Sequence, residues 1–209
     1  MEWSERADTA IERYAAGETR GLDQRQLTQL GNAAWAAGLS LLMAGRTEEA
    51  AEWLRRSAQR YRDSWEGAPP DSWGRPIAAM KALLLAGDDA VEAARWALDA
   101  GAADAESPIG RYAGTLALLV LGDDVGARVL GTTLRDRDDF PPDVADALVE
   151  LAGADRVDYA IALENILDSF EQRADFLEDV AVADTVLVLQ RLAEPRGVAV
   201  ELEASPLLP

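Results

Sequence analysis

The sequence contains no histidine and no cysteine among its 209 residues. Histidine is the usual general base near neutral pH and the commonest metal ligand, so its absence excludes Ser-His and Cys-His catalysis and ordinary zinc sites. The absence of cysteine excludes disulfides and thiolate chemistry, and it fits a reducing compartment. We therefore expect a protein that is not an enzyme, with no catalytic residues, no metal site and no cofactor.

Lysine is almost absent, since Lys81 is the only one and the other basic residues are arginines. The chain carries 38 acidic against 20 basic residues, a net charge of −18. An acidic surface poor in lysine is typical of a halophilic-type protein that stays soluble in concentrated salt, where ions screen the repulsion between carboxylates. The alternative is an acidic face made for a basic partner. Either interpretation disfavours nucleic acid, whose binding depends on basic residues.

Long apolar runs are also missing, because no segment reaches the roughly 20 apolar residues of a membrane span. The first residues, 1–6, are acidic and contain no apolar signal core. From these two observations we expect a cytoplasmic protein that does not bind a membrane.

The main feature that is present is an apolar helical segment that ends at a glycine and is followed by a polar residue. It occurs four times, around Gly45, Gly87, Gly122 and Gly153. Helices paired in this way stack into a surface that binds other molecules. The pattern predicts an all-α fold, an irregular helical-hairpin repeat of the tetratricopeptide-like α-solenoid type, with about 9–10 helices.

We expect one helical-repeat domain over 1–209. It begins with helices in 1–65, continues through a loop at 66–75 rich in proline and glycine, and contains repeated hairpins in 76–194. The rest, 195–209, is predicted to be an extended tail, with a short strand at 198–202 as the weaker alternative.

The first hairpin is the most tetratricopeptide-like part of the chain. Gly45 is followed by Ala50, Leu54 and Ala58, which lie four residues apart and therefore fall on one helical face. Gly31 and Gly38 lie inside the helix predicted from Asp23 to Ala44, and we expect them to mark close contacts between helices.

The loop offers the first candidate partner-binding residues, which are Trp65, Asp71, Trp73 and Arg75. A tryptophan combines a large apolar face with an N–H donor, and an arginine offers a planar fork of five donors, so both suit an interface. The alternative is that both tryptophan rings fill gaps between helical hairpins.

Arg111 and Tyr112 are further candidates, one turn into a helix that Ser107-Pro108 opens with a cap and a first-turn proline. They would present donors to a partner. Alternatively, Arg111 pairs with a carboxylate of a neighbouring helix and Tyr112 is half-buried.

A third group is acidic and lies in a helix predicted from Asp155 toward Asp179. Spacing of i, i+4, i+7 and i+8 places four carboxylates on one helical face: Glu171, Asp175, Glu178 and Asp179. Such a face is more commonly solvated than part of an Mg²⁺, Ca²⁺ or glycosidase site. Glu178, Asp179 and Asp184 are therefore candidates for partner binding. Asp184 also reads, with Thr185, as the cap of the last helix.

Two aspartate pairs, Asp88-Asp89 and Asp123-Asp124, follow helix-ending glycines. Their best interpretation is as N-caps that accept hydrogen bonds from free helix N–H groups. A role in metal binding is the alternative.

Several soft motifs, taken in order, resemble a known family. They are Ser107–Tyr112, Gly122–Asp124, Asp138–Pro141, Ser169–Arg173, Val182–Thr185, Arg196–Gly197 and Ser205–Pro206. From about Trp65 to the C-terminus the chain resembles the all-helical immunity protein family forty-nine of polymorphic-toxin systems. The resemblance implies a small cytoplasmic protein that binds a cognate toxin and neutralises it by occlusion.

Three hypotheses of function remain open at this point. The first is a toxin-neutralising binder whose protein partner is a basic toxin domain. The second is a general helical scaffold for protein–protein interaction. The third is a carboxylate-dependent enzyme that uses Asp175 and Glu178. The sequence leaves the partner, the binding face and the oligomeric state open.

Overall fold

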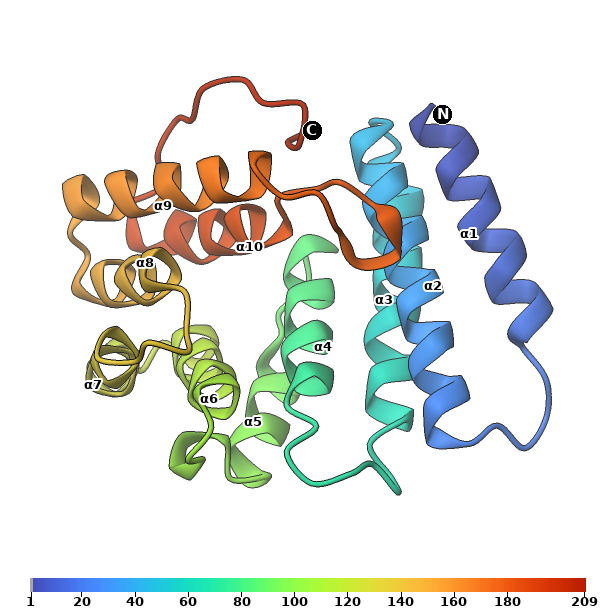
Figure 1. Cartoon of the computed structure of the whole chain (residues 1–209), viewed down its shortest axis with the longest axis horizontal. Coiled ribbons are helices and arrows are strands. Elements are labelled where there is room, and N and C mark those ends of the chain that lie inside the picture. Colours follow the sequence, from blue (N-terminus) through green and yellow to red (C-terminus); the bar gives the residue numbers. More distant parts are fainter. Residues whose placement is uncertain (1) are drawn as a thin grey trace. The chain divides into compact units, whose positions relative to one another are not determined.

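The structure is a computed structural model, and it describes residues 2–209 (Figure 1). The α-helices are α1 (Trp3–Gly17), α2 (Gln24–Met43), α3 (Thr47–Asp63), α4 (Gly74–Leu85), α5 (Val91–Asp99), α6 (Pro108–Leu121), α7 (Asp124–Arg135), α8 (Pro142–Gly153), α9 (Arg156–Glu171) and α10 (Asp184–Ala193). Short 3₁₀ turns are η1 (Ala102–Asp104), η2 (Leu177–Asp179) and η3 (Glu194–Arg196). Residues 2–209 contain no β-strand, which confirms the predicted all-α fold.

The contacts divide the chain into two compact units. The first unit contains the chain up to Asp88, together with Arg173–Val182 and Ser205–Pro209. The second unit contains Asp89–Gln172 and Ala183–Ala204. A single repeat domain over 1–209 stays a prediction. Among the described residues, none of the helices combines the length and the apolar character needed to cross a bilayer.

In the first unit, each of the helices α1 to α4 packs against the next one in the chain (Figure 1). Helices α2 and α3 lie close together at the two glycines inside α2. A Cβ at Gly31 would lie 3.1 Å from ring carbons of Tyr61, and a Cβ at Gly38 would lie 2.6 Å from Cγ of Leu54. The predicted close contacts at these two glycines are confirmed.

The predicted apolar face of α3 is also confirmed, because Ala50, Leu54 and Ala58 are all buried. Ala50 belongs to a core cluster with Leu41 of α2 and Ala7 of α1. Three consecutive helices therefore share this part of the core, and they do so through small or compact side chains that let the helices approach closely.

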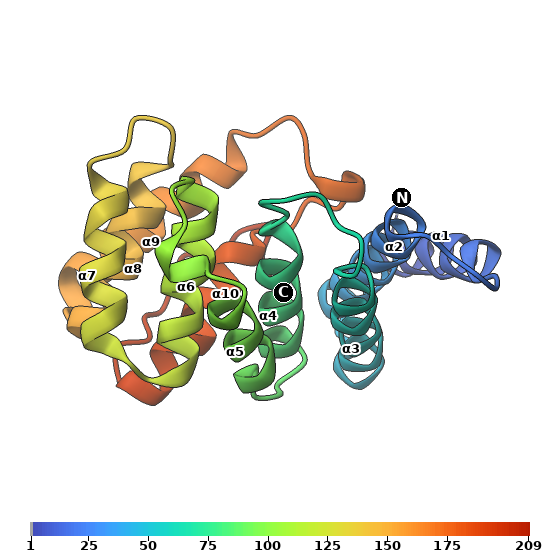
Figure 2. The ribbon, with the colours of Figure 1, turned by 90° about the horizontal axis from the view of Figure 1, so that it is seen from below.

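In the second unit, the helices from α6 to α9 again pack in chain order, and α10 packs against α8 and α9 (Figure 2). Arg196, just after α10, joins the ends of these elements. Its guanidinium donates to the carbonyl oxygens of Leu192 and Leu119, both at 2.7 Å, and pairs with Asp124 at 2.5 Å. These bonds tie the end of α10 to the end of α6 and to the first residue of α7.

Three of the four anchor glycines end their helices as predicted. Gly45, Gly87 and Gly122 have φ values of 74°, 78° and 75°, the left-handed conformation that glycine adopts without a steric penalty. The fourth differs, because α8 continues through Gly153 and the left-handed residue is Ala154, with φ of 53°. The helix still ends at Gly153, as predicted, but this glycine is its last helical residue and does not adopt the left-handed conformation.

Of the N-caps predicted at the two aspartate pairs, the one at Asp123 is confirmed and the one at Asp88 is not. Asp123 caps α7 as predicted, since its side chain accepts from the backbone N–H of Gly126 at 2.9 Å. Asp88 does not cap α5, because α5 begins only at Val91 and Asp88 instead pairs with Arg55 at 2.6 Å. The hydrogen bond from Arg55 lowers the pKa of the Asp88 carboxyl below its usual value.

Candidate functional site

The predicted loop cluster is largely occupied by contacts within the first unit. The rings of Trp65 and Trp73 lie 6.2 Å apart, and Trp73 is only 7% exposed. The indole N–H of Trp73 donates to the carboxylate of Asp71 at 3.1 Å. Little of the Trp73 ring is thus free to reach a partner, and the packing alternative describes its contacts.

Arg75 is also buried, and its hydrogen-bond donors are engaged within the first unit. It is 9% exposed and donates to the carbonyl oxygen of Ser64 at 2.5 Å and to the side-chain oxygen of Gln24. Burial lowers the pKa of its guanidinium below the usual value. Its donors hold α4 against α2 and the end of α3.

Arg111 and Tyr112 lie in the first turn of α6, which Ser107 caps as predicted by accepting from the N–H of Gly110. Arg111 donates to the carbonyl oxygen of Ala105 at 3.1 Å rather than to a carboxylate. Tyr112 is 8% exposed, and its ring lies 5.7 Å from that of Phe140. Both side chains therefore hold local structure at the start of α6.

The predicted four-carboxylate helical face is wrong, because α9 ends at Glu171. Glu178 and Asp179 follow in a turn with φ of 58° at both residues, which no α-helix accommodates. The turn is held by α1, whose Arg13 pairs with Glu178 at 2.7 Å and whose Arg6 donates to the carbonyl oxygen of Asp179 at 2.7 Å. Both bonds connect the turn to α1 and not to α9.

Asp184 is the first residue of α10, and the residue at the N-cap is Ala183, without a side-chain cap bond. The prediction that Asp184 caps this helix is therefore wrong. Its carboxylate accepts instead from the hydroxyl of Thr185 at 3.5 Å.

The structure brings together a different set of polar residues, which the sequence did not single out. A pocket of about 270 Å³ in the second unit lies along α8, between the end of α7 and the first half of α9. We call it the acidic groove, and its lining residues are Arg135, Asp146, Glu150, Asp158, Ile161, Ala162 and Asn165.

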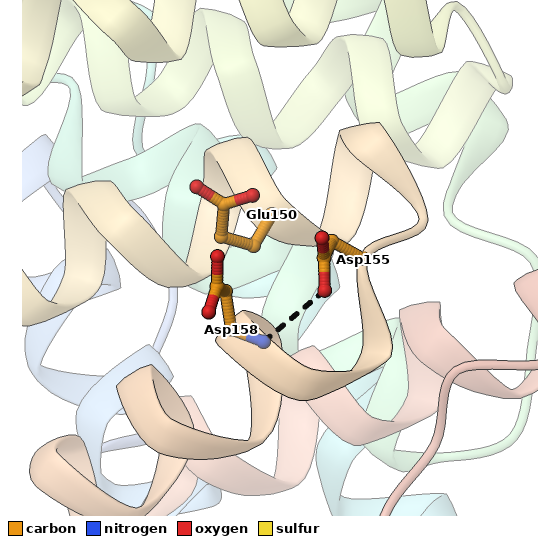
Figure 3. Close-up of side chains that lie close together, drawn as sticks. All are labelled: Glu150, Asp155 and Asp158. Atoms are coloured by element: carbon orange, nitrogen blue, oxygen red, sulfur yellow. Dashed lines mark hydrogen bonds between the residues drawn. The ribbon is translucent and has the colours of Figure 1, made fainter.

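The local sequence explains why these side chains meet. Asp146 and Glu150 are four residues apart on α8, so they project from the same face. Asp155 caps α9 by accepting from the N–H groups of Val157 and Asp158, at 3.1 and 3.2 Å, and this fixes the first turn of α9. Glu150, Asp155 and Asp158 consequently place carboxylate oxygens within 4.8 Å of one another. Figure 3 shows these three side chains close together.

The groove contains one basic side chain, Arg135. Its guanidinium pairs with Asp146 at 2.6 Å and also with Glu150. Although desolvation opposes it, these hydrogen bonds raise the pKa of Arg135. One cation thus stands among four carboxylates when Asp155 is included, which leaves the groove with a net negative charge.

The same contacts bear on whether the three carboxylates in Figure 3 suit a metal ion. Glu150 already accepts from Arg135, and one oxygen of Asp155 already accepts from two backbone N–H groups. Arg135 and the two N–H groups use one oxygen of Glu150 and one of Asp155, so the other oxygen of each is open to a cation without displacing these donors. The contacts of the three carboxylates therefore do not by themselves decide between a metal ion and an organic cation.

In comparisons with known proteins, no family model, no curated protein and no solved structure matches the chain. The resemblance to an immunity family therefore stays a prediction.

Proposed function

We propose that this chain is a non-catalytic, cytoplasmic binding protein whose partner is a basic protein domain, held in the manner of an immunity protein that occludes a toxin. The observation that carries the proposal is the uncompensated negative charge. Even with every basic residue paired to one carboxylate, 18 of the 38 acidic residues would have no basic counterpart in the chain.

The arginines strengthen this argument because many of them are engaged within the chain. Arg13, Arg55, Arg135 and Arg196 all pair with carboxylates of other elements. The remaining acidic surface faces solvent, where it would accelerate association with a positively charged partner and select against acidic ones. A stable complex of this type would bury about 1,600 Å² in total.

A second candidate function is a general scaffold for protein–protein interaction. It is favoured by the order of packing, because consecutive helices pair in both units as they do in helical-repeat proteins. Such a scaffold would bind several partners, whereas an immunity-type protein would bind one.

The test is to express each reading frame that neighbours this gene, alone and together with this chain. We expect one of them to encode a basic domain that arrests growth alone, that is harmless in co-expression, and that co-purifies with this chain at low salt. If no neighbouring product is toxic, and the purified chain captures several unrelated proteins equally, the immunity proposal fails and the scaffold is favoured.

A further inference from the structure

We infer that the acidic groove receives a cationic side chain from a basic amphipathic segment of the protein partner, and that an apolar residue of the same segment covers Val157 and Ile161. This inference rests on the proposed function and specifies one binding surface for it. The occupant is defined by two properties of the groove, its apolar rim and its unbalanced charge.

The apolar rim lies on α9. Val157 is 69% exposed and Ile161 is 53% exposed, and both are among the large apolar side chains that the second unit leaves open to solvent. They are four residues apart, so they are neighbours on one face of the helix. Ile161 also lines the groove itself, which places apolar surface directly beside the carboxylates.

The charge of the groove is unbalanced on the α9 side. Arg135 reaches Asp146 and Glu150 from α7, which shows that the α8 carboxylates accept a guanidinium in this geometry. Asp158 lines the groove from α9, with a carboxylate oxygen within 4.8 Å of one of Glu150. Among the described residues, the ion pairs of Arg135 reach Asp146 and Glu150, and none reaches Asp158. A second cation entering from solvent would therefore meet Asp158 and the free capacity of Glu150.

A polypeptide cation fits these features better than a metal ion. A lysine or arginine side chain has an apolar stem that packs on Ile161 and Ala162 while its charged end reaches the carboxylates. It can bind without displacing Arg135 or the backbone donors of α9. A divalent ion would gain nothing from exposed Val157 and Ile161.

The experiment uses the full chain and a fluorescein-labelled helical peptide that combines arginines on one face with leucines on the other. A matched peptide with glutamine in place of arginine is the control ligand. Binding is followed by fluorescence anisotropy at low salt. We expect the arginine peptide to bind and the glutamine peptide to bind much more weakly, because the latter lacks the charge.

Two matched double variants locate the site. Glu150→Gln with Asp158→Asn removes two charges inside the groove, whereas Glu164→Gln with Asp168→Asn removes two charges from α9 outside the groove lining. We expect about tenfold weaker peptide binding for the first pair and less than about twofold for the second. Ile161→Ser, at an exposed position, should also weaken binding while the circular dichroism spectrum stays unchanged.

Equal weakening by both double variants would overturn the inference, because the peptide would then respond to net charge alone. Binding of Mg²⁺ or Ca²⁺ at a stoichiometry of one, lost in the groove variant, together with no binding of the arginine peptide, would also overturn it in favour of a metal site. The proposed function is tested separately: if the groove variant still neutralises the partner fully, the groove is wrong and the binding function stands. If wild-type protein binds the peptide but neutralises no partner, the function is wrong.

Discussion

Gly38 of α2 lies directly against Leu54 of α3, so closely that a Cβ at position 38 would be 2.6 Å from Cγ of Leu54 and 3.2 Å from its backbone nitrogen. Leu54 is fully buried. Because neither the buried side chain nor the backbone of α3 has room to retreat, the distance between these two helices depends on the absence of a side chain at position 38.

Gly38→Ala should therefore destabilise the protein although alanine is the better helix former. Helix propensity alone would stabilise the variant by about 1 kcal/mol. Overpacking of a tight core opposes this with about 1–3 kcal/mol, and at 2.6 Å we expect the upper part of that range, for a net loss of about 1–2 kcal/mol. Urea unfolding measures the difference.

Gly74→Ala is the matched control, because Gly74 is also helical but a Cβ there would meet nothing within 4 Å. It should be neutral or slightly stabilising. If Gly38→Ala proved as stable as Gly74→Ala, the close approach of α2 and α3 would be contradicted.

Exchanging the two residues at the end of α8, Gly153→Ala with Ala154→Gly, should stabilise the protein. Ala154 has φ of 53°, a conformation that glycine adopts more easily than alanine. Gly153 is helical, and a Cβ there would meet the guanidinium of Arg128 at an ordinary distance of 3.6 Å. Each half of the exchange is worth about 0.5–1 kcal/mol, so we expect about 1–2 kcal/mol in total from urea unfolding.

The single variants separate the two contributions. Ala154→Gly alone should stabilise by relieving the left-handed alanine, and Gly153→Ala alone by favouring the helix. A destabilising effect of Ala154→Gly would show that the left-handed conformation at this position is not the native one.

The helices of this chain could be predicted from the sequence because their signals are local. Gly45 and Gly122 end helices where the pattern places them, and Ser107 and Asp123 cap the helices that follow. The non-helical turn at Glu178 and Asp179 was missed because its partners are distant in the sequence. Glu178 and Asp179 leave the helical conformation in a turn held by Arg13 and Arg6 of α1, more than 160 residues earlier in the chain.

The site was harder to predict than the fold. Tryptophan and arginine were chosen for their chemistry, yet Trp73 and Arg75 are buried because their polar groups find partners inside the first unit. The acidic groove was missed because it needs the relative placement of α7, α8 and α9. The four-residue spacing of Asp146 and Glu150 was the available signal, and it was hidden among many other acidic pairs.

The stability of the protein should fall in alkaline solution because of Tyr159. Its ring is fully buried, and burial raises the pKa of its phenol well above the usual value of 10.0. Below about pH 10 the folded and unfolded states both hold the proton, so this residue adds no pH dependence. Above that pH the unfolded state loses the proton and the folded state keeps it, so stability falls as pH rises, by up to about 1.4 kcal/mol per pH unit.

Tyr159→Phe removes this dependence. The variant loses the hydrogen bond from the phenol to the side chain of Gln190, which is 3.4 Å long, so we expect a loss of at most about 1 kcal/mol near neutral pH. Between about pH 10 and 12 its free energy of unfolding should fall less steeply than that of the wild type. Parallel slopes for the two proteins in urea titrations would show that Tyr159 is not buried as described.

The net charge of −18 predicts that salt stabilises the protein. Acidic residues outnumber basic ones by 38 to 20, so repulsion between carboxylates dominates the long-range electrostatics of the folded state. Raising KCl from low concentration to about 1 M shortens the screening length from more than 10 Å to about 3 Å, and the melting temperature should rise. Exposed ion pairs such as Arg95–Glu92 weaken in salt, but each contributes little to stability.

Choline chloride is the control salt. Because screening depends on ionic strength alone, it should raise the melting temperature as KCl does. A melting temperature that rises with KCl only would indicate a specific interaction of potassium with the hydrated carboxylates. A melting temperature that stays flat in both salts would show that repulsion between the carboxylates does not limit the stability of the folded state.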